Sequence, residues 1–461
     1  MQSRGIKEIY DGYFNIVDDF FGSIRSHLGP EEDSHINLGL EIASYPLVSD
    51  LFLDAIDDIG EIIEDYWRKN LADIIGYIER QDCLKCVYSG DITPPILEKI
   101  VKRSALYIDT VILPDPIYNL VYFQKNIARD EKYFLNKLIR HVFNIWKLRE
   151  LILADTKERF LLILPINLDF INPKDRDSLL RSAETKFVSY LGHLFEQEFV
   201  DRESCFDYLG LKNSSKDILN NIKRPELLPN MFKKLKPLDG FLNEMHATRK
   251  YAKIPGGSIG DTFGIYVSAQ FLRVQEHKFI CQRLGAEPIY DNQLAWFFFN
   301  YEMGGLDMDA AIASALQQET FEWLTGVPLQ AIRVFREEGK LEYMRSVIRR
   351  GITDIKAKQS KDLLEVSKTI QENMQEELRR HAREMDALKK EVRDIVRKEI
   401  PIASAGYLAG LIPWYGFVVS LPFILRDILR LLGKKRKAAQ IIKENEGAFV
   451  NLLLKSYEEK N

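Results

Sequence analysis

The longest uncharged run of the chain, residues 400–425, constrains the fold more than any other feature. It contains no Asp, Glu, Lys or Arg, and about 20 apolar residues are enough to cross the hydrocarbon core of a bilayer. However, Pro413 and Pro422 lie inside the run, and a proline in an exposed helix interior costs about 3 kcal/mol. Length therefore favours a membrane segment, whereas the prolines predict a helical module that is broken rather than straight.

The residues around the prolines argue against a simple membrane span. Trp414 and Tyr415 stand in the middle of the run, although the aromatic anchors of a single span prefer the two membrane interfaces. Residues 402–412 would form a helix of only about 16 Å, which is too short to cross. We therefore expect either a re-entrant wedge or burial within the protein. The side chains expected to contact a membrane are Leu408, Leu411, Ile412, Trp414, Tyr415, Phe417, Val418 and Phe423.

A basic cluster follows the apolar run. It consists of Lys434, Lys435, Arg436 and Lys437, and each such side chain near an anionic bilayer contributes about 1 kcal/mol of attraction. Basic residues also precede the run, which favours both of its ends on the cytoplasmic side. Residues 400–432 are expected to form an apolar module that is membrane-associating or buried, and residues 433–461 a basic-to-mixed tail helix.

A highly charged segment, residues 356–399, precedes the apolar module. Of its 44 residues, 22 are charged, which predicts one long helix with a solvated surface. Apolar residues recur at alternating three- and four-residue steps, the spacing of a coiled-coil seam, with a polar gap in the middle. They are Leu363, Ile370, Met374, Met385, Leu388, Val392 and Ile395. The pattern fits a coiled coil that joins two copies of the chain, or an antiparallel helical hairpin within one copy.

Two short apolar segments in the N-terminal half predict buried β-strands. They are "ALYIDTVIL", residues 105–113, and "RFLLILPI", residues 159–166. The residues between them have a helical pattern, and a strand, a helical crossover and a second strand form a parallel pair. We therefore expect a mainly α fold with a small α/β element. Residues 1–240 would form a helical body that contains this element, and residues 241–355 a further helical domain.

Three carboxylates accompany the predicted strands. Asp109 and Asp115 flank the end of the first strand, and Asp169 follows the second. Carboxylates that meet at adjacent strand ends can bind Mg²⁺, which prefers oxygen ligands. The alternative is ordinary turn chemistry, because Asp beside Pro is common where a strand ends.

Two pairs of residues have spacings that suit half of a zinc site. Cys83 and Cys86 form a Cys-x-x-Cys motif, and His277 and Cys281 lie four residues apart on a predicted helix. Together they could supply the Cys₃His ligands of a tetrahedral zinc. The alternative is four ordinary buried residues, because a free Cys packs like a small apolar side chain.

Composition narrows the classes of partner and compartment. The net charge is −4, which argues against a dedicated nucleic-acid binder because such proteins carry a basic excess. Four Cys in 461 residues are too few for a disulfide framework, and the first residues lack the apolar stretch of a secretory signal. We therefore expect a cytoplasmic protein, at the cytoplasmic face of the membrane if residues 400–425 contact lipid, with no specific nucleic acid as partner.

The order of these features favours a non-enzymatic protein with a membrane-associated sensing, scaffold or effector function. In this hypothesis the body recognises a signal, residues 356–399 transmit it or form a homo-oligomer, and the apolar module contacts an anionic membrane surface. No cofactor is expected. Two alternatives stay open. One is a metal-dependent hydrolase or nucleotide-processing enzyme that uses Asp109, Asp115 and Asp169, and the other is a soluble helical scaffold whose apolar run is buried.

Overall fold

The computed structural model describes the N-terminal two thirds of the chain and a few later stretches. The described residues are 5–27, 46–90, 94–127, 131–154, 159–166, 176–251, 257–291, 293–303, 308–327, 329, 332–333, 336, 345–346, 348–349, 365–376 and 379. Asp169, the apolar module, the basic cluster and the tail, all expected from the sequence, lie outside these residues. The same holds for most of the charged segment 356–399.

The chain divides into two compact units. Unit 1 comprises Met1–Leu97, Ile108–Ala315 and Gln359–Leu363, and unit 2 comprises Glu98–Tyr107, Leu316–Lys358 and Leu364–Asn461. The boundary expected between residues 240 and 241 falls inside a helix, Leu235–Tyr251.

Unit 1 consists mainly of helices, as the sequence predicts. Its helices are α1 (Ile6–His27), α3 (Pro46–Glu79), α5 (Pro116–Ile127), α6 (Glu131–Leu153), α8 (Arg176–Phe195), α9 (Arg202–Gly210), α10 (Ser215–Asn221), η2 (Pro225–Leu227), η3 (Asn230–Phe232), α11 (Leu235–Tyr251), α12 (Ile259–Leu284), α13 (Gln293–Met303) and α14 (Met308–Ala315). Helix α4 (Pro94–Ser104) begins in unit 1 and ends in unit 2, and η4 (Glu319–Gly326) belongs to unit 2.

A small parallel sheet of four strands lies at the centre of unit 1. Its strands are β1 (Lys85–Tyr88), β2 (Thr110–Pro114), β3 (Leu161–Leu164) and β4 (Glu287–Ile289), in the spatial order β3-β2-β1-β4. The first three are buried along their whole length. The prediction of a parallel pair with a helical crossover is confirmed, because β2 and β3 are parallel neighbours connected through α5 and α6. The sequence did not reveal β1 and β4.

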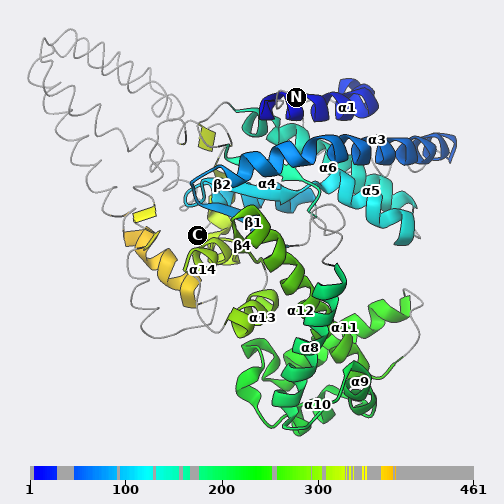
Figure 1. The fold of residues 1–461 in the computed structure, drawn as a ribbon, viewed down its shortest axis with the longest axis vertical. Coiled ribbons are helices and arrows are strands. Elements are labelled where there is room, and N and C mark those ends of the chain that lie inside the picture. The colour runs from blue at the N-terminus through cyan, green and yellow to red at the C-terminus, as the bar shows by residue number, and fades with distance from the viewer. Residues whose placement is uncertain are drawn as a thin grey trace, which may run out of the picture. The chain divides into compact units, whose positions relative to one another are not determined.

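Helices α1, α3, α5 and α6 form one group beside the sheet (Figure 1). Tyr10, Tyr13 and Val17 lie on the buried face of α1, and Ile63 and Trp67 on that of α3. These residues recur every three or four positions, so each helix presents one apolar side to its neighbours.

Helix α12 connects the sheet to a second helical group, formed by α8–α11 and α13 (Figure 1). A capping box fixes its start, because the Ser258 hydroxyl accepts from the Asp261 amide and the Asp261 side chain accepts from the Ser258 amide. Gly285 ends the helix in the left-handed conformation, with φ of 57°, which glycine adopts without steric cost. The chain then enters β4 after a single intervening residue, Ala286.

Residues 365–376 are helical, as predicted for this part of the charged segment. Val366, Ile370 and Met374 are buried at four-residue intervals, and Ser367 is buried beside them. The full coiled-coil seam stays a prediction, since most of it lies beyond the described residues. Of the helices that the structure describes, none is both long and apolar enough to cross a membrane.

Candidate ligand-binding site

The spatial order of the strands reverses direction beside β1. From β1 the chain adds β2 and then β3 on one side, and after helices α8–α12 it adds β4 on the other side of β1. In open parallel sheets a ligand binds outside the carboxyl ends of the strands at such a reversal. The carboxyl ends of β1 and β4 are therefore the candidate site. We call Tyr88, Arg273, His277, Tyr290 and Asp291 the switch-point site.

A hydrogen bond joins the carboxyl ends of β1 and β4. The buried Tyr88 hydroxyl donates to Oδ2 of Asp291 over 2.8 Å, and the Ser89 amide donates to the Ile289 carbonyl over 3.0 Å. Gly90 lies directly against this pair, because a Cβ built there would overlap the Tyr88 hydroxyl and Asp291 Oδ2. A larger residue at this position would have to displace both side chains, and the backbone comes close to the Asp291 carboxylate.

Arg273 brings a positive charge to the same edge of the sheet. Its Nη2 donates to the Ser89 carbonyl, and its side chain is partly exposed. Within the described parts of the chain, this is the one hydrogen bond of its guanidinium, and no carboxylate pairs with it. A guanidinium presents five N–H donors in a planar fork that matches the oxygens of a phosphate or carboxylate. Arg273 is thus equipped to bind an anion at the end of β1.

His277 and Tyr290 are buried near Arg273. His277 follows Arg273 by one helical turn on α12, so both side chains lie on the same face of the helix. The His277 ring packs against the Tyr290 ring, with the two centroids 5.2 Å apart. His277 is 4% exposed and Tyr290 is fully buried, and neither the imidazole nitrogens nor the phenol oxygen has a hydrogen-bond partner among the described residues. Buried polar atoms without a partner are uncommon and call for an explanation.

Both rings stay uncharged at neutral pH. Burial, with the neighbouring Arg273 charge as a second cause, lowers the pKa of His277 from 6.5 to about 3. Burial also raises the pKa of the Tyr290 hydroxyl well above its ordinary value, and the Cys281 thiol nearby adds to the shift. A neutral imidazole offers one donor and one acceptor, and a phenol offers both functions on one oxygen. The pair can therefore bind a neutral polar group.

The structure does not bring together the carboxylates that the sequence suggested as a metal site. Asp109 precedes β2 and accepts from the Leu84 amide at the amino end of the sheet, over 2.8 Å. Asp115 follows β2 at the carboxyl end, about 20 Å away at roughly 3.3 Å per residue. Asp169 lies outside the described residues. A metal centre that uses both Asp109 and Asp115 is not supported by these positions.

Asp115 is instead a buried structural centre. Its Oδ1 accepts from the Tyr13 hydroxyl over 3.0 Å and from the amides of Ile117 and Tyr118, and its Oδ2 accepts from Trp67 Nε1 over 2.8 Å. These bonds cap α5 and join it to α1 and α3. Burial raises the pKa of the Asp115 carboxyl, while the bond from Trp67 and the others oppose the shift. Both oxygens are occupied by the protein's own donors.

The structure also leaves the four suggested zinc ligands separate. Cys86 is buried within β1, Cys83 lies just before it with its thiol 3.8 Å from the Thr110 hydroxyl, and His277 and Cys281 are buried on α12. No three His, Cys, Asp or Glu side chains within the described ranges lie close enough to hold one metal ion. Burial and the Glu287 charge raise the pKa of the Cys281 thiol well above its ordinary value, whereas zinc binds the thiolate.

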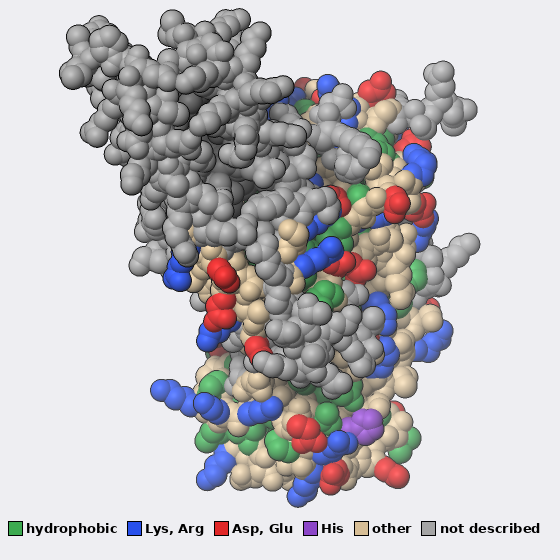
Figure 2. Space-filling model, turned by 90° about the vertical axis from the view of Figure 1, so that its left-hand side faces the viewer, with side chains coloured by type: hydrophobic (Ala, Val, Ile, Leu, Met, Phe, Trp, Pro, Cys, Tyr) green, Lys and Arg blue, Asp and Glu red, His purple; other side chains and the backbone are tan. Residues whose placement is uncertain are grey.

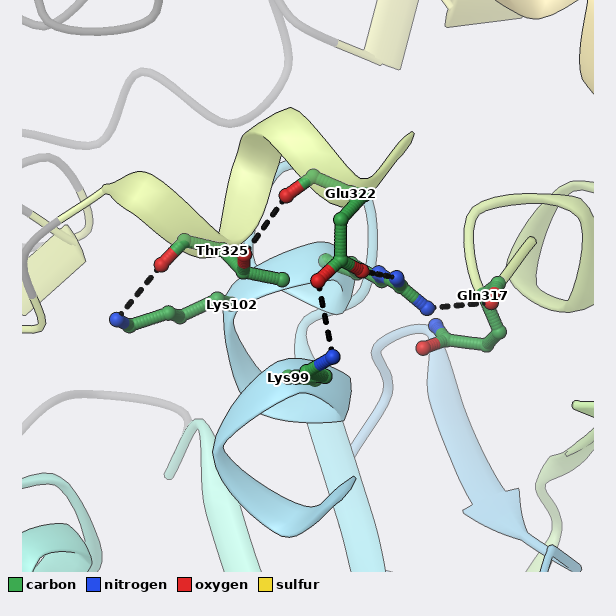
Figure 3. Close-up of polar contacts among 6 residues, drawn as sticks. Lys99, Lys102, Gln317, Glu322 and Thr325 are labelled. Atoms are coloured by element: carbon green, nitrogen blue, oxygen red, sulfur yellow. Dashed lines mark hydrogen bonds and ion pairs between the residues drawn. The ribbon is translucent and has the colours of Figure 1, made fainter. Parts of the chain in front are cut away.

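Unit 2 contains a dense set of polar contacts that hold the second half of α4 (Figure 3). Arg103 donates to the Gln317 carbonyl over 2.5 Å and pairs with Glu322. Lys99 pairs with the same carboxylate over 2.9 Å, and Lys102 donates to the Thr325 carbonyl over 2.9 Å. We call these contacts the α4 clamp. They explain why this half of α4 folds with η4.

Arginines from later in the chain bind the turn that follows α4 in unit 2. Arg336 donates to the Ala105 carbonyl over 3.1 Å, and Arg345 to the Tyr107 carbonyl over 2.7 Å. Arg349 donates to the Tyr107 hydroxyl over 2.9 Å and lies over the ring of the same residue. Cations near the last carbonyls of a helix offset its dipole. These basic side chains thus have partners within unit 2.

The surface charge fits the small net charge of the chain. On the face that Figure 2 shows, acidic and basic side chains of the described residues are interspersed and do not gather into one basic patch. A dedicated nucleic-acid surface would show such a patch. The described side chains on this face form no such patch.

Comparisons with known proteins found no match of any kind. No family model, no curated protein and no solved structure matches the chain.

Proposed function

We propose that the protein is a non-enzymatic sensing protein that acts at an anionic membrane surface. In this proposal unit 1 recognises a small ligand at the switch-point site, and the C-terminal part of the chain is the effector. The observation that carries the sensing role is Arg273, a guanidinium without an acidic partner among the described residues, held at the carboxyl end of β1 where the strand order reverses.

The architecture supports a recognition role for unit 1. The switch-point site is built on β1, β4 and the long helix α12, so its polar groups are fixed by regular elements. The Ser89 carbonyl accepts a hydrogen bond from Arg273, and the Ser89 amide donates one to the Ile289 carbonyl. A site on such elements is held more precisely than one on loops alone.

The order of features in the sequence supports the effector role. The charged segment 356–399, the apolar run at residues 400–425 and the basic cluster Lys434–Lys437 follow in this order along the chain. Apolar side chains would enter the interface while the basic cluster binds anionic headgroups, and two such signals together give stable attachment.

Flotation of the full-length protein with vesicles tests the effector role. We expect it to float with vesicles that contain phosphatidylserine and to remain unbound with phosphatidylcholine alone, because the basic cluster needs anionic lipid. Replacing Lys434, Lys435, Arg436 and Lys437 by Gln should abolish flotation. The matched control replaces four exposed lysines of unit 1, Lys216, Lys233, Lys234 and Lys236, by Gln, with the same change in net charge.

Equal loss in both quadruple variants would contradict the proposal, because the effect would then follow net charge alone. If neither the parent protein nor the control floats, the result favours the soluble scaffold instead. In that case Trp414 fluorescence should be protected from aqueous quenchers and should not change when vesicles are added.

A further inference from the structure

We propose that the switch-point site binds a phosphorylated sugar, with the phosphate on Arg273 and a sugar hydroxyl on Asp291. This inference rests on the proposed sensing role of unit 1 and names the class of its ligand. It does not depend on the membrane role of the C-terminal part.

The phosphate position follows from Arg273, which carries a positive charge at the carboxyl end of β1. The Arg273 guanidinium is bound at the Ser89 carbonyl and keeps its other donors for a ligand. Helix α4, which begins at Pro94, offers no amide in its first two positions, because Pro94 and Pro95 carry no N–H. The phosphate is therefore assigned to the guanidinium.

The sugar position follows from Asp291. Its carboxylate follows β4 and lies against Gly90, so it also reaches the carboxyl end of β1. A carboxylate repels a phosphate but accepts hydrogen bonds from hydroxyl groups, and acidic residues bind ribose in this way in doubly wound folds. The Tyr88 hydroxyl fixes the carboxylate through Oδ2. One cation and one fixed acceptor at the same strand end suit a ligand with a phosphate and a hydroxyl.

His277 and Tyr290 supply the third element of the ligand class. Their three polar atoms lack partners among the described residues although both side chains are at least nine-tenths buried. His277 lies one helical turn, roughly 6 Å, from Arg273 on α12, and the Tyr290 ring packs against it. A neutral donor and acceptor at this depth fit a ring oxygen, a further hydroxyl or the polar edge of a base. They do not favour a second charged group.

Protection of Arg273 from chemical modification tests the phosphate position. The full-length protein is treated with phenylglyoxal alone and with inorganic phosphate, ribose 5-phosphate, AMP or ribose, and modified arginines are measured by peptide mass spectrometry. We expect the three phosphate-bearing compounds to slow modification of Arg273 several-fold and ribose to leave it unchanged. Arg283 is the internal control, since it lies on the same helix, is exposed and pairs with Glu79. Equal protection of both arginines, or none at Arg273, would overturn the proposal.

Calorimetric titration of variants tests the sugar position. Arg273→Gln should lose binding of every phosphate compound, Arg273→Lys should retain part of it, and Arg283→Gln should behave as the parent protein. Asp291→Asn should weaken the binding of ribose 5-phosphate by roughly tenfold, the effect of one charge-assisted hydrogen bond, and should not weaken the binding of inorganic phosphate, because the carboxylate repels it. Equal affinity of inorganic phosphate and ribose 5-phosphate would overturn the assignment of a sugar. Tighter binding of AMP than of ribose 5-phosphate identifies a nucleotide, and the reverse a free sugar phosphate.

A failure of the ligand assignment can be distinguished from a failure of the proposed membrane role. Binding and protection are measured without vesicles, and flotation is measured without phosphate compounds. A protein that floats but shows no protection at Arg273 keeps its membrane role and loses the ligand assignment.

Discussion

The hydroxyl of Tyr13 donates a hydrogen bond of 3.0 Å to Oδ1 of Asp115, 102 residues later in the chain. Trp67 donates to the other oxygen of the same carboxylate, and the rings of Tyr13 and Trp67 lie 5.1 Å apart. One buried carboxylate thus joins α1, α3 and the start of α5 at the carboxyl end of β2. The contact is long-range, so it forms only when these elements pack together.

Removal of the Asp115 carboxylate should destabilise unit 1. Asp115→Ala leaves the Trp67 indole, the Tyr13 hydroxyl and two amides of α5 without their acceptor, and each buried group without a partner costs about 1–3 kcal/mol. We expect a loss of at least about 3 kcal/mol in urea unfolding. Trp67→Phe removes one donor and should cost about 1 kcal/mol. Asp177→Ala, an exposed acid in the first turn of α8, is the control, and an equal effect there would contradict the role of Asp115.

Buried histidines should make unit 1 sensitive to acid. Burial, followed by the charges of Lys137 and Arg140, lowers the pKa of His141 from 6.5 to about 3, and His277 has a similar shift. Between pH 6.5 and about 3 the unfolded chain therefore binds more protons than the folded one, so stability falls as pH falls. The slope is about 1.4 kcal/mol per pH unit for each histidine.

The raised pKa of Asp115 acts in the opposite direction. Its folded form holds a proton to higher pH than the unfolded form does, so its contribution to stability decreases as pH rises from about 3.9 through the folded pKa.

Urea unfolding measured from pH 7 to pH 4 tests the histidine effect. The substitutions His141→Gln and His277→Gln should each lower the pH dependence of the unfolding free energy by about 1.4 kcal/mol per pH unit, because one histidine fewer takes up a proton on unfolding. A pH dependence unchanged in both variants would contradict the histidine effect.

The sequence reveals β2 and β3 but not the other half of the sheet, for physical reasons. Residues 105–113 and 159–166 contain apolar runs with β-branched and aromatic side chains, so the sequence predicts that they form buried strands. Strand β1 has four residues, one of them Lys85, and β4 has three, one of them Pro288. A proline is tolerated there because β4 is at the edge of the sheet. Short strands with such residues do not differ from loops in pattern.

The sequence does not reveal the switch-point site, for a related reason. Arg273 and Ser89 lie 184 positions apart, and no periodicity connects a helix to a strand over that distance. Asp109 and Asp115 were grouped because they flank one strand, but a strand separates its two ends. The one usable signal was the pair Tyr290 and Asp291 after a short apolar segment, since polar residues at the carboxyl end of a parallel strand are where ligands bind.

Replacement of the two α4-clamp cations that pair with Glu322 should have unequal effects on the stability of unit 2. Arg103 is 8% exposed and donates both to Glu322 and to the Gln317 carbonyl. Arg103→Met should therefore destabilise unit 2 by about 1–3 kcal/mol, because a buried carbonyl loses its donor. The Lys99 side chain is 41% exposed, and Lys99→Met should cost less than about 1 kcal/mol. Hydrogen exchange of residues 316–327 measures the effect locally, and equal acceleration in both variants would contradict the difference.

Two glycines at different helix positions should respond in opposite ways to replacement by alanine. A Cβ at Gly260, near the start of α12, would collide with the Leu209 carbonyl, and the Gly260 amide already donates to the Lys212 carbonyl over 2.9 Å. Gly260→Ala should cost about 1–3 kcal/mol, since α9 and α12 must move apart. Gly240 lies on the exposed side of α11 with no atom within 4 Å of its would-be Cβ, so Gly240→Ala should stabilise by about 1 kcal/mol through helix propensity. Both are measured by urea unfolding, and a Gly260→Ala variant that is as stable as the parent protein or more stable would show that α9 and α12 are not in close backbone contact.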